Sequence, residues 1–296
     1  MNSSMATTVF LPVALGIVML GLGLSLTVAD FTRVMRYPKA TIVALGCQIL
    51  VLPAVCLGLV LLFDLEPTLA VGMMLLAAAP GGTTANLFSH LARGDVALNV
   101  TLTAINSVLA VVTLPIVVNL ALAGFLDGDG GGEGAIGLQP AKMLQVFAIV
   151  LIPVAIGMLI RRKAPEFTER MRGPVKIASI VVLVAVIVVA VWQERANVLG
   201  YLRDVGLVAV LLCVISLTIG YLVPRAARIE RRQAIASAFE IGLHNSTLAI
   251  TIALSPSLLD STRMAIPAAV YGILMFVPAA VLAALFARER RPAPIQ

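Results

Sequence analysis

Long apolar stretches separated by short polar breaks make up most of the chain. Runs such as 143–160 and 177–191 consist almost entirely of apolar residues. A helix of about 20 apolar residues, at about 1.5 Å per residue, spans the roughly 30 Å hydrocarbon layer of a membrane. A membrane barrel would instead show alternating polar and apolar residues, and the chain has no such alternation. The segments are therefore predicted to be membrane-spanning helices.

Nine such segments are separated by breaks rich in Asp, Glu, Pro or Gly. They cover about 8–29, 40–63, 68–91, 96–125, 141–160, 175–192, 198–222, 233–254 and 264–287. The sequence thus predicts an all-α integral membrane protein with nine transmembrane helices in a single domain over residues 1–296.

Composition agrees with this prediction and excludes other classes. Hydrophobic residues make up 60% of the chain and charged residues 12%, whereas soluble domains carry about 25% charged residues. The net charge of +6 does not indicate nucleic-acid binding, because the basic residues lie mostly in short loops. The three cysteines lie inside apolar runs without ligand spacing, so neither a disulfide framework nor a metal centre is expected.

The basic residues predict an orientation in the membrane. With the N-terminus outside, 17 of the 21 Lys and Arg residues fall on the inner side, mostly within 33–39, 161–176, 225–232 and 288–291. Only Lys142, Arg195, Arg203 and Arg263 remain outside. Cytoplasmic loops carry such an excess, so we expect an external N-terminus and a cytoplasmic C-terminus in a plasma membrane or cell inner membrane. The basic inner loop would also contact anionic lipid.

The third and eighth segments are interrupted by polar residues. The third contains Ala-Pro-Gly-Gly-Thr-Thr-Ala-Asn at 79–86, and the eighth contains Phe-Glu-Ile-Gly-Leu-His-Asn-Ser-Thr at 239–247. A broken helix frees backbone groups, each of which costs several kcal/mol if left unsatisfied in lipid. The breaks should therefore face protein, water or a ligand.

The two interrupted segments are five apart, so they run in opposite directions. Residues 8–125 and 175–287 can form two inverted four-helix repeats joined by the helix at about 141–160. Broken helices in corresponding positions of two halves are typical of a transporter site, where helix N-termini attract an anion and unwound carbonyls coordinate a cation.

Glu240 is the most informative polar residue. A carboxylate at the bilayer centre costs at least about 2.5 kcal/mol, and no basic residue lies deep in another segment to neutralise it. A bound cation would do so. Asn99 and Thr103 share one helix face, and Asn86 and Asn106 are also more polar than packing requires.

These segments resemble the bile acid:sodium symporter family. The likeness rests on Pro-Gly-Gly-Thr-Thr-Ala-Asn at 80–86, Ala-Arg-Gly-Asp-Val-Ala-Leu at 92–98 and Glu-Ile-Gly-Leu-His-Asn-Ser at 240–246, together with 21–26, 38–40 and Gln48. The motifs occur in the family's order over nearly the whole chain. The resemblance implies crossing broken helices in a core domain, about 40–125 and 198–287, beside a panel domain, about 8–30 and 141–192.

The resemblance also implies sodium-coupled symport of a small organic anion, such as a bile acid-like or carboxylate metabolite, by alternating access. No cofactor beyond the coupling sodium ions is implied. The first implied sodium site comprises Ala85, Asn86, Asn99, Thr103 and Glu240; the second comprises Gln48, Glu240, Ile241, Leu243 and His244. The anion is expected near Thr83, Thr84 and Asn245.

Three residues depart from the family pattern. Ala85 and Asn99 stand where serine is common, and His244 stands where glutamine is common. Ala85 provides no hydroxyl ligand, and His244 places an imidazole where glutamine is common. Both changes weaken the interpretation that two sodium ions bind. Coupling to one sodium ion and coupling to protons through His244 both stay open. An intramembrane enzyme is a weaker alternative, because no aspartate pair or nucleophile–base pair is evident.

The predicted topology can be tested by accessibility. Single cysteines introduced at Gly130 and Pro165 should react from opposite faces of the membrane, because the first lies in a predicted external loop and the second in a predicted internal loop. We expect a membrane-impermeant thiol reagent to label the Gly130 position in intact cells and the Pro165 position only after permeabilisation. External labelling of both would contradict the nine-helix arrangement.

Overall fold

The described part of the chain is all-helical. The computed structural model describes residues 33–126, 140–171, 198–255 and 258–288, with shorter stretches inside 16–29 and 173–181. Across these residues it contains helices, turns and one isolated β-bridge, and no strand. Four helices are long and apolar enough to cross a membrane, namely Pro38–Leu62, Val96–Phe125, Gly200–Ala226 and Thr262–Arg288.

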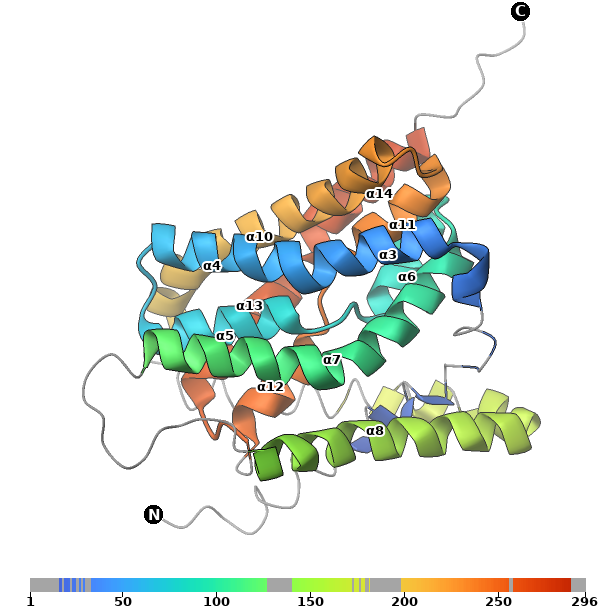
Figure 1. Ribbon diagram of the computed structural model, residues 1–296, viewed down its shortest axis with the longest axis horizontal. Helices are drawn as coiled ribbons and strands as arrows, with labels where there is room; N and C mark the ends of the chain where they lie inside the picture. The colour runs from blue at the N-terminus through green and yellow to red at the C-terminus, as the bar shows by residue number, and fades with distance from the viewer. Residues whose placement is uncertain are drawn as a thin grey trace, which may run out of the picture.

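The helices lie in two parts of the chain, before and after residues 164–197 (Figure 1). In the first part they are η1 (Arg33–Arg36), α3 (Pro38–Gly46), the π-helix η2 (Cys47–Val51), α4 (Leu52–Leu62), α5 (Pro67–Ala78), α6 (Thr83–Leu91), α7 (Val96–Phe125) and α8 (Pro140–Lys163). In the second part they are α10 (Val198–Ala226), α11 (Arg231–Gly242), α12 (Ser246–Leu254), α13 (Thr262–Leu274) and α14 (Phe276–Arg288).

Seven of the predicted segments coincide with these helices. The two interrupted segments are the pairs α5/α6 and α11/α12, as the polar breaks predicted. The segments at 8–29 and 175–192 lie largely outside the described residues, so the count of nine remains a prediction. The π-helix and the separation of α13 from α14 were not predicted.

Local sequence sets the helix starts. Pro38 and Pro67 occupy the first positions of α3 and α5, where no backbone N–H is required. The side chains of Asp95 and Ser261 accept hydrogen bonds from Leu98 N and Met264 N, at 3.0 and 3.3 Å, and so cap α7 and α13.

The two broken helices meet at their breaks near the middle of the molecule (Figure 1). Gly82 N donates to Leu243 O at 3.0 Å, and Asn245 N donates to Pro80 O at 2.8 Å. Gly81 and His244 form the isolated antiparallel bridge. Backbone groups freed by each break are therefore satisfied by the other break, as burial in an apolar environment requires.

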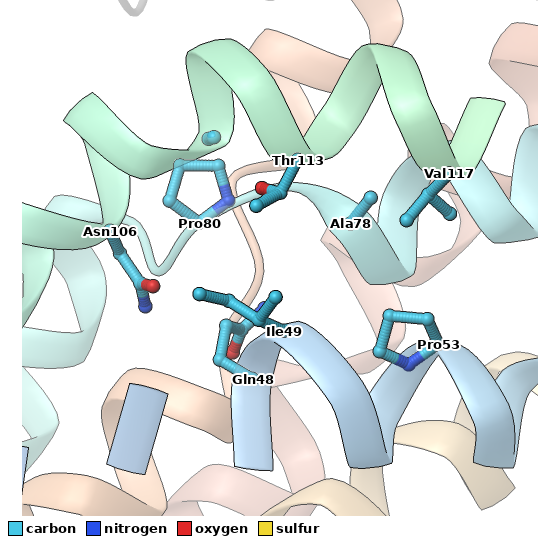
Figure 2. A pocket seen from close by; sticks show the side chains of 9 residues that line it. Gln48, Ile49, Pro53, Ala78, Pro80, Asn106, Thr113 and Val117 are labelled. Atoms are coloured by element: carbon cyan, nitrogen blue, oxygen red, sulfur yellow. The ribbon is translucent and has the colours of Figure 1, made fainter. Parts of the chain in front are cut away.

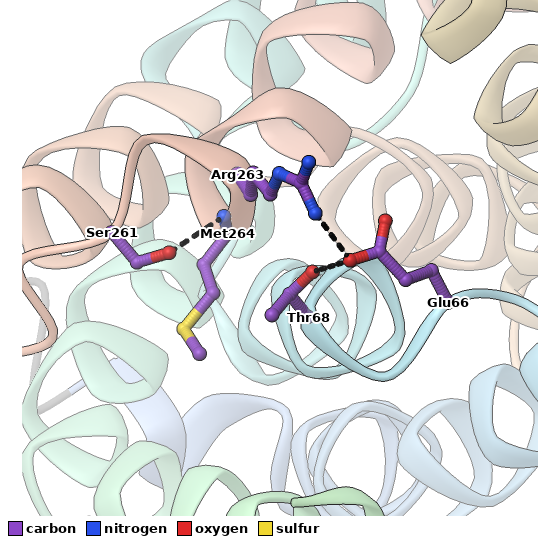
Figure 3. A network of polar contacts seen from close by, with 5 residues as sticks. All are labelled: Glu66, Thr68, Ser261, Arg263 and Met264. Atoms are coloured by element: carbon purple, nitrogen blue, oxygen red, sulfur yellow. Dashed lines mark hydrogen bonds and ion pairs between the residues drawn. The ribbon is translucent and has the colours of Figure 1, made fainter.

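Opposite ends of the bundle differ in charge. Asp95 N donates to Arg232 O at 2.9 Å, which ties the start of α7 to α11 at the end that also carries Arg93, Arg228 and Arg231. At the other end, Glu66, the residue before α5, forms an ion pair with Arg263 of α13, with 2.7 Å between Glu66 Oε1 and Arg263 Nη1 (Figure 3). The clustering of arginines at one end is the pattern on which the predicted orientation rests.

Small residues allow α10 and α11 to pack closely. A Cβ added at Gly220 would lie 2.8 Å from Ala238 Cα and 3.1 Å from Ser237 O, both backbone atoms that cannot rotate away. A Cβ added at Gly58, on α4, would meet nothing within 4 Å. The same substitution therefore has different consequences at the two glycines.

Gly220→Ala should destabilise the protein, because the added methyl group forces two helices apart. Overpacking of this kind costs about 1–3 kcal/mol, whereas Gly58→Ala should cost little. Thermal unfolding of the detergent-solubilised protein measures both effects. Equal unfolding midpoints for the two variants would contradict close packing at Gly220.

Candidate functional site

Glu240 lies on α11 and is fully buried. The Thr103 hydroxyl donates to Glu240 Oε2 at 2.5 Å, and Asn106 Nδ2 donates to Oε1 at 3.5 Å. The Gly81 backbone also hydrogen-bonds to the carboxylate. Among the described residues, no basic side chain forms an ion pair with Glu240. The site thus holds a buried acid surrounded by neutral polar groups.

Asn99, one helical turn before Thr103 on α7, has a side-chain oxygen without a hydrogen-bond partner. Its Nδ2 donates to Ala236 O at 2.7 Å, which places Asn99 against the turn of α11 that precedes Glu240. Its Oδ1 is buried and accepts no hydrogen bond, and the same holds for Asn86 Oδ1 on α6. Helix α6 packs against both α7 and α11. Buried acceptors without donors are rare and destabilising. Two of them lie here on the helices that pack against α11, which carries the Glu240 carboxylate.

Gln48 and His244 form a second set of polar side chains, at the break between α5 and α6. Gln48 Nε2 donates to Ala77 O at 3.3 Å and to Ala79 O at 3.1 Å. His244 Nδ1 lies 3.3 Å from the same Ala79 oxygen, and because a carbonyl only accepts, Nδ1 carries the hydrogen. In the neutral ring Nε2 then bears a lone pair. His244 Nε2 and Gln48 Oε1 are both buried without a partner.

The remaining predicted cation residues contribute little beyond their backbone. Ala85 and Ile241 are fully buried and have no polar side-chain atom. The Leu243 carbonyl already accepts the hydrogen bond from Gly82 N. The structure therefore joins Thr103 to Glu240, and it brings Gln48 and His244 to one carbonyl, that of Ala79. Asn86 lies on α6, which packs against α7 and α11.

The starts of α6 and α12 lie next to each other at the crossing. A Cβ added at Gly82, the residue before α6, would be 3.8 Å from Asn245 Cα, the residue before α12. Asn245 Oδ1 accepts from Leu248 N at 3.0 Å and so caps α12. Thr84 and Asn245 are partly exposed, and the side chain of Thr83 lies outside the described residues. Two adjacent helix N-termini favour an anionic group.

A small pocket adjoins the site between α7 and the π-helix η2 (Figure 2). Gln48 and Asn106 line one end of it, and Thr113 lies farther along α7. From the sequence Asn106 is predicted only to be more polar than packing requires, and nothing in it singles out Thr113. Their spacing from Asn99, at seven and fourteen residues, places all three on one helix face and is the signal that could have identified them.

The chain is similar to known sodium transporters. The Sodium Bile acid symporter family matches residues 12–201, more than half of the chain. An uncharacterised sodium-dependent transporter, YocS, of Bacillus subtilis is 26% identical over 95% of this chain and 84% of its own. The probable chloroplastic sodium/metabolite cotransporter BASS1 of Arabidopsis thaliana is 29% identical over 96% of this chain and 67% of its own. The human ileal sodium/bile acid cotransporter is 25% identical over 84% and 70%.

Apolar spanning helices, a pair of broken helices and a buried polar centre define a multi-pass membrane transporter. The chain belongs to the Sodium Bile acid symporter family. The resemblance noted in the sequence is thereby confirmed, whereas the roles of individual residues remain to be proposed.

Gly81 should be required for the geometry of the carboxylate. A Cβ at this position would collide with the carboxylate of Glu240, whereas a Cβ at Gly82 would meet its nearest atom, Thr84 Oγ1, at 3.4 Å. We expect Gly81→Ala to abolish stabilisation by sodium in a thermal-unfolding assay and Gly82→Ala to retain it. Sodium stabilisation of Gly81→Ala equal to that of the unmodified protein would show that the carboxylate can move without consequence.

Proposed function

We propose that the protein is a sodium-coupled secondary active transporter that carries a small organic anion by alternating access. The observation that carries the proposal is Glu240, a buried carboxylate with no basic partner among the described residues, together with the buried, unpaired oxygens of Asn86 and Asn99 on the two helices that pack against α11. A monovalent hard cation satisfies all three at once, because it supplies positive charge and accepts oxygen ligands. The relatives named as sodium-dependent transporters support sodium as that cation.

The principal cation position is proposed among Asn86, Asn99, Thr103 and Glu240, with the Ala85 backbone beside it. Asn99 Oδ1 takes the place of the hydroxyl that the family commonly has there. The loss of a hydroxyl at Ala85 is offset in part by the Asn86 oxygen, which has no other partner.

A second cation position is proposed around Gln48, His244 and the carbonyls of Ile241 and Leu243. It is the weaker of the two, because the Leu243 oxygen is already engaged and an imidazole nitrogen is a poor sodium ligand. Gln48 Oε1 is its one unpaired side-chain oxygen.

The organic anion is proposed to bind where α6 and α12 begin, near Thr83, Thr84 and Asn245. Partial positive charge from two adjacent helix N-termini attracts a carboxylate or sulfate there. Sodium bound at Glu240 lies on the other side of the same breaks, so cation and anion stabilise the same arrangement of the crossing. That shared stabilisation is the physical basis of coupling.

Movement of a core against a panel would switch access between the two membrane faces. We assign residues 40–125 and 198–287 to the core and residues 8–30 and 141–192 to the panel. Residues 8–125 and 175–287 form the two inverted repeats of this proposal. The N-terminus is placed outside. The helix that contains Gly23 packs closely on α8, because a Cβ added at Gly23 or at Gly157 would collide with the other helix. This close packing supports the placement of both helices in the panel.

Glu240→Gln tests the proposal with a change of charge and almost no change of shape. Sodium-dependent uptake should fall at least about tenfold, or about 1.4 kcal/mol, because the neutral amide no longer offsets the charge of the cation. Uptake into proteoliposomes measures this, with an anion first identified by thermal-shift screening of small carboxylates and sulfates with and without sodium. Glu66→Gln is the matched control, since Glu66 is an exposed glutamate at the molecular surface. Normal uptake by Glu240→Gln would remove Glu240 from the cation site.

Proton coupling is the second candidate. It is favoured by His244, whose Nε2 is buried without a partner and could accept a proton in the position where the family commonly has glutamine. A pH gradient that drives uptake in sodium-free vesicles, and fails to do so in His244→Gln, would establish it. Uptake that requires sodium at every pH gradient would exclude it.

A further inference from the structure

Tyr271 of α13 reaches into the break between α11 and α12. It is the largest of the fully buried side chains in the described part of the chain. Its hydroxyl donates to Gly242 O at 2.7 Å and accepts from the backbone N–H of His244. The Tyr271 and His244 rings also pack together, with 5.4 Å between their centroids. One side chain from another helix thus holds both a carbonyl and an N–H of the same break.

These bonds replace the ones that an unbroken helix would make. In an α-helix each N–H donates to the carbonyl four residues back. The His244 N–H would then bond to Glu240 O, but it bonds to the tyrosine hydroxyl instead. The Asn245 N–H would bond to Ile241 O, but it donates to Pro80 O at 2.8 Å. Each redirected N–H leaves one carbonyl of α11 without its helical donor.

The two carbonyls that lose their donors differ from their neighbours in the break. Gly242 O accepts from the tyrosine hydroxyl, and Leu243 O accepts from Gly82 N at 3.0 Å. Glu240 O and Ile241 O accept no hydrogen bond from any described residue, although both residues are fully buried. Buried main-chain groups are nearly always paired, so these two oxygens require a partner.

The open carbonyls suit a cation. They lie at the C-terminal end of α11, where a helix carries partial negative charge, and the Glu240 carboxylate belongs to the same turn. The end of α5 differs, because Ala77 O and Ala79 O accept from Gln48 Nε2. Protein donors thus occupy carbonyls at the end of α5, whereas two carbonyls at the end of α11 remain open.

We propose that Tyr271 is a positioning residue of the cation site, because its hydroxyl holds the His244 N–H and so keeps Glu240 O open as a main-chain ligand for sodium. Glu240 then contributes oxygens from its main chain as well as from its side chain. The Ile241 oxygen is kept open separately, by Pro80. This inference rests on the proposed sodium-coupled function and adds a ligand and the residue that controls it.

Tyr271→Phe removes the hydroxyl and keeps the ring. The His244 N–H can then return to Glu240 O, which withdraws that oxygen from the cation. We expect the dissociation constant for sodium, measured from the dependence of the unfolding temperature on sodium concentration, to rise at least about tenfold, or about 1.4 kcal/mol. A purely structural hydrogen bond would lower the unfolding temperature without sodium and leave the dissociation constant unchanged, and that result would overturn the proposal.

Tyr221→Phe is the matched control. Tyr221 lies on α10 and packs against Phe286 of α14, with 4.7 Å between the ring centroids, rather than against the break. Loss of its hydroxyl should leave the dissociation constant for sodium unchanged. An equal rise in both variants would show that the effect does not depend on the position of Tyr271, and would reject the inference.

Infrared spectroscopy tests the carbonyl itself in the unmodified protein. Glutamate that is isotope-labelled at its main-chain carbonyl reports on Glu240, the one buried glutamate among the described residues. Sodium should shift the labelled band when it replaces choline, because a coordinated cation polarises the C=O bond. The shift should be absent from Tyr271→Phe.

The outcomes separate this inference from the proposed function. A labelled band that sodium leaves unchanged, in a protein that sodium stabilises, rejects the main-chain ligand and leaves sodium coupling intact. Absence of any sodium effect on the unfolding of the unmodified protein rejects both. A sodium-dependent shift of the labelled band supports the inference even if the Tyr271→Phe protein cannot be purified.

Discussion

The site depends on the crossing of two broken helices through backbone hydrogen bonds. A break in a membrane helix is tolerated only when its freed N–H and C=O groups find partners. Here Pro80 and Gly82 on one chain segment bond to Asn245 and Leu243 on the other. Each break therefore makes the other possible. Removing one would leave unsatisfied backbone in the middle of the bundle.

The crossing also fixes what can lie on either side of it. The small size of Gly81 leaves room for the Glu240 carboxylate directly against the bridge. The starts of α6 and α12 emerge beside it, and the partial positive charge of their N-termini favours an anion. The proposed cation and anion sites thus share one structural support. In the proposed transporter, binding of the cation or of the anion changes the stability of the crossing on which the other ion's site depends.

The departures from the family pattern alter the two cation positions unequally. Near Ala85, the amide oxygens of Asn86 and Asn99 remain available. Near His244, the imidazole donates to the Ala79 carbonyl, which also accepts from Gln48. At the second position the Leu243 carbonyl is already engaged, and Gln48 Oε1 is the one side-chain oxygen without a partner. In the proposed transporter this difference favours coupling to a single sodium ion at Glu240.

Sequence alone determined the helical membrane architecture and the positions of both helix breaks, and it predicts a role for Glu240. These follow from local rules: apolar run length, Pro-Gly-Gly at 80–82, and the cost of a carboxylate in lipid. Tertiary structure alone decided which side-chain oxygens have no hydrogen-bond partner. The amide groups of Asn99 and Gln48 donate their hydrogens to carbonyls that are far away in sequence, at Ala236, Ala77 and Ala79. It also decided that Asn106 reaches Glu240 and that a pocket adjoins it. Such contacts depend on how helices 30 to 140 residues apart are placed against each other, and no local pattern encodes that placement.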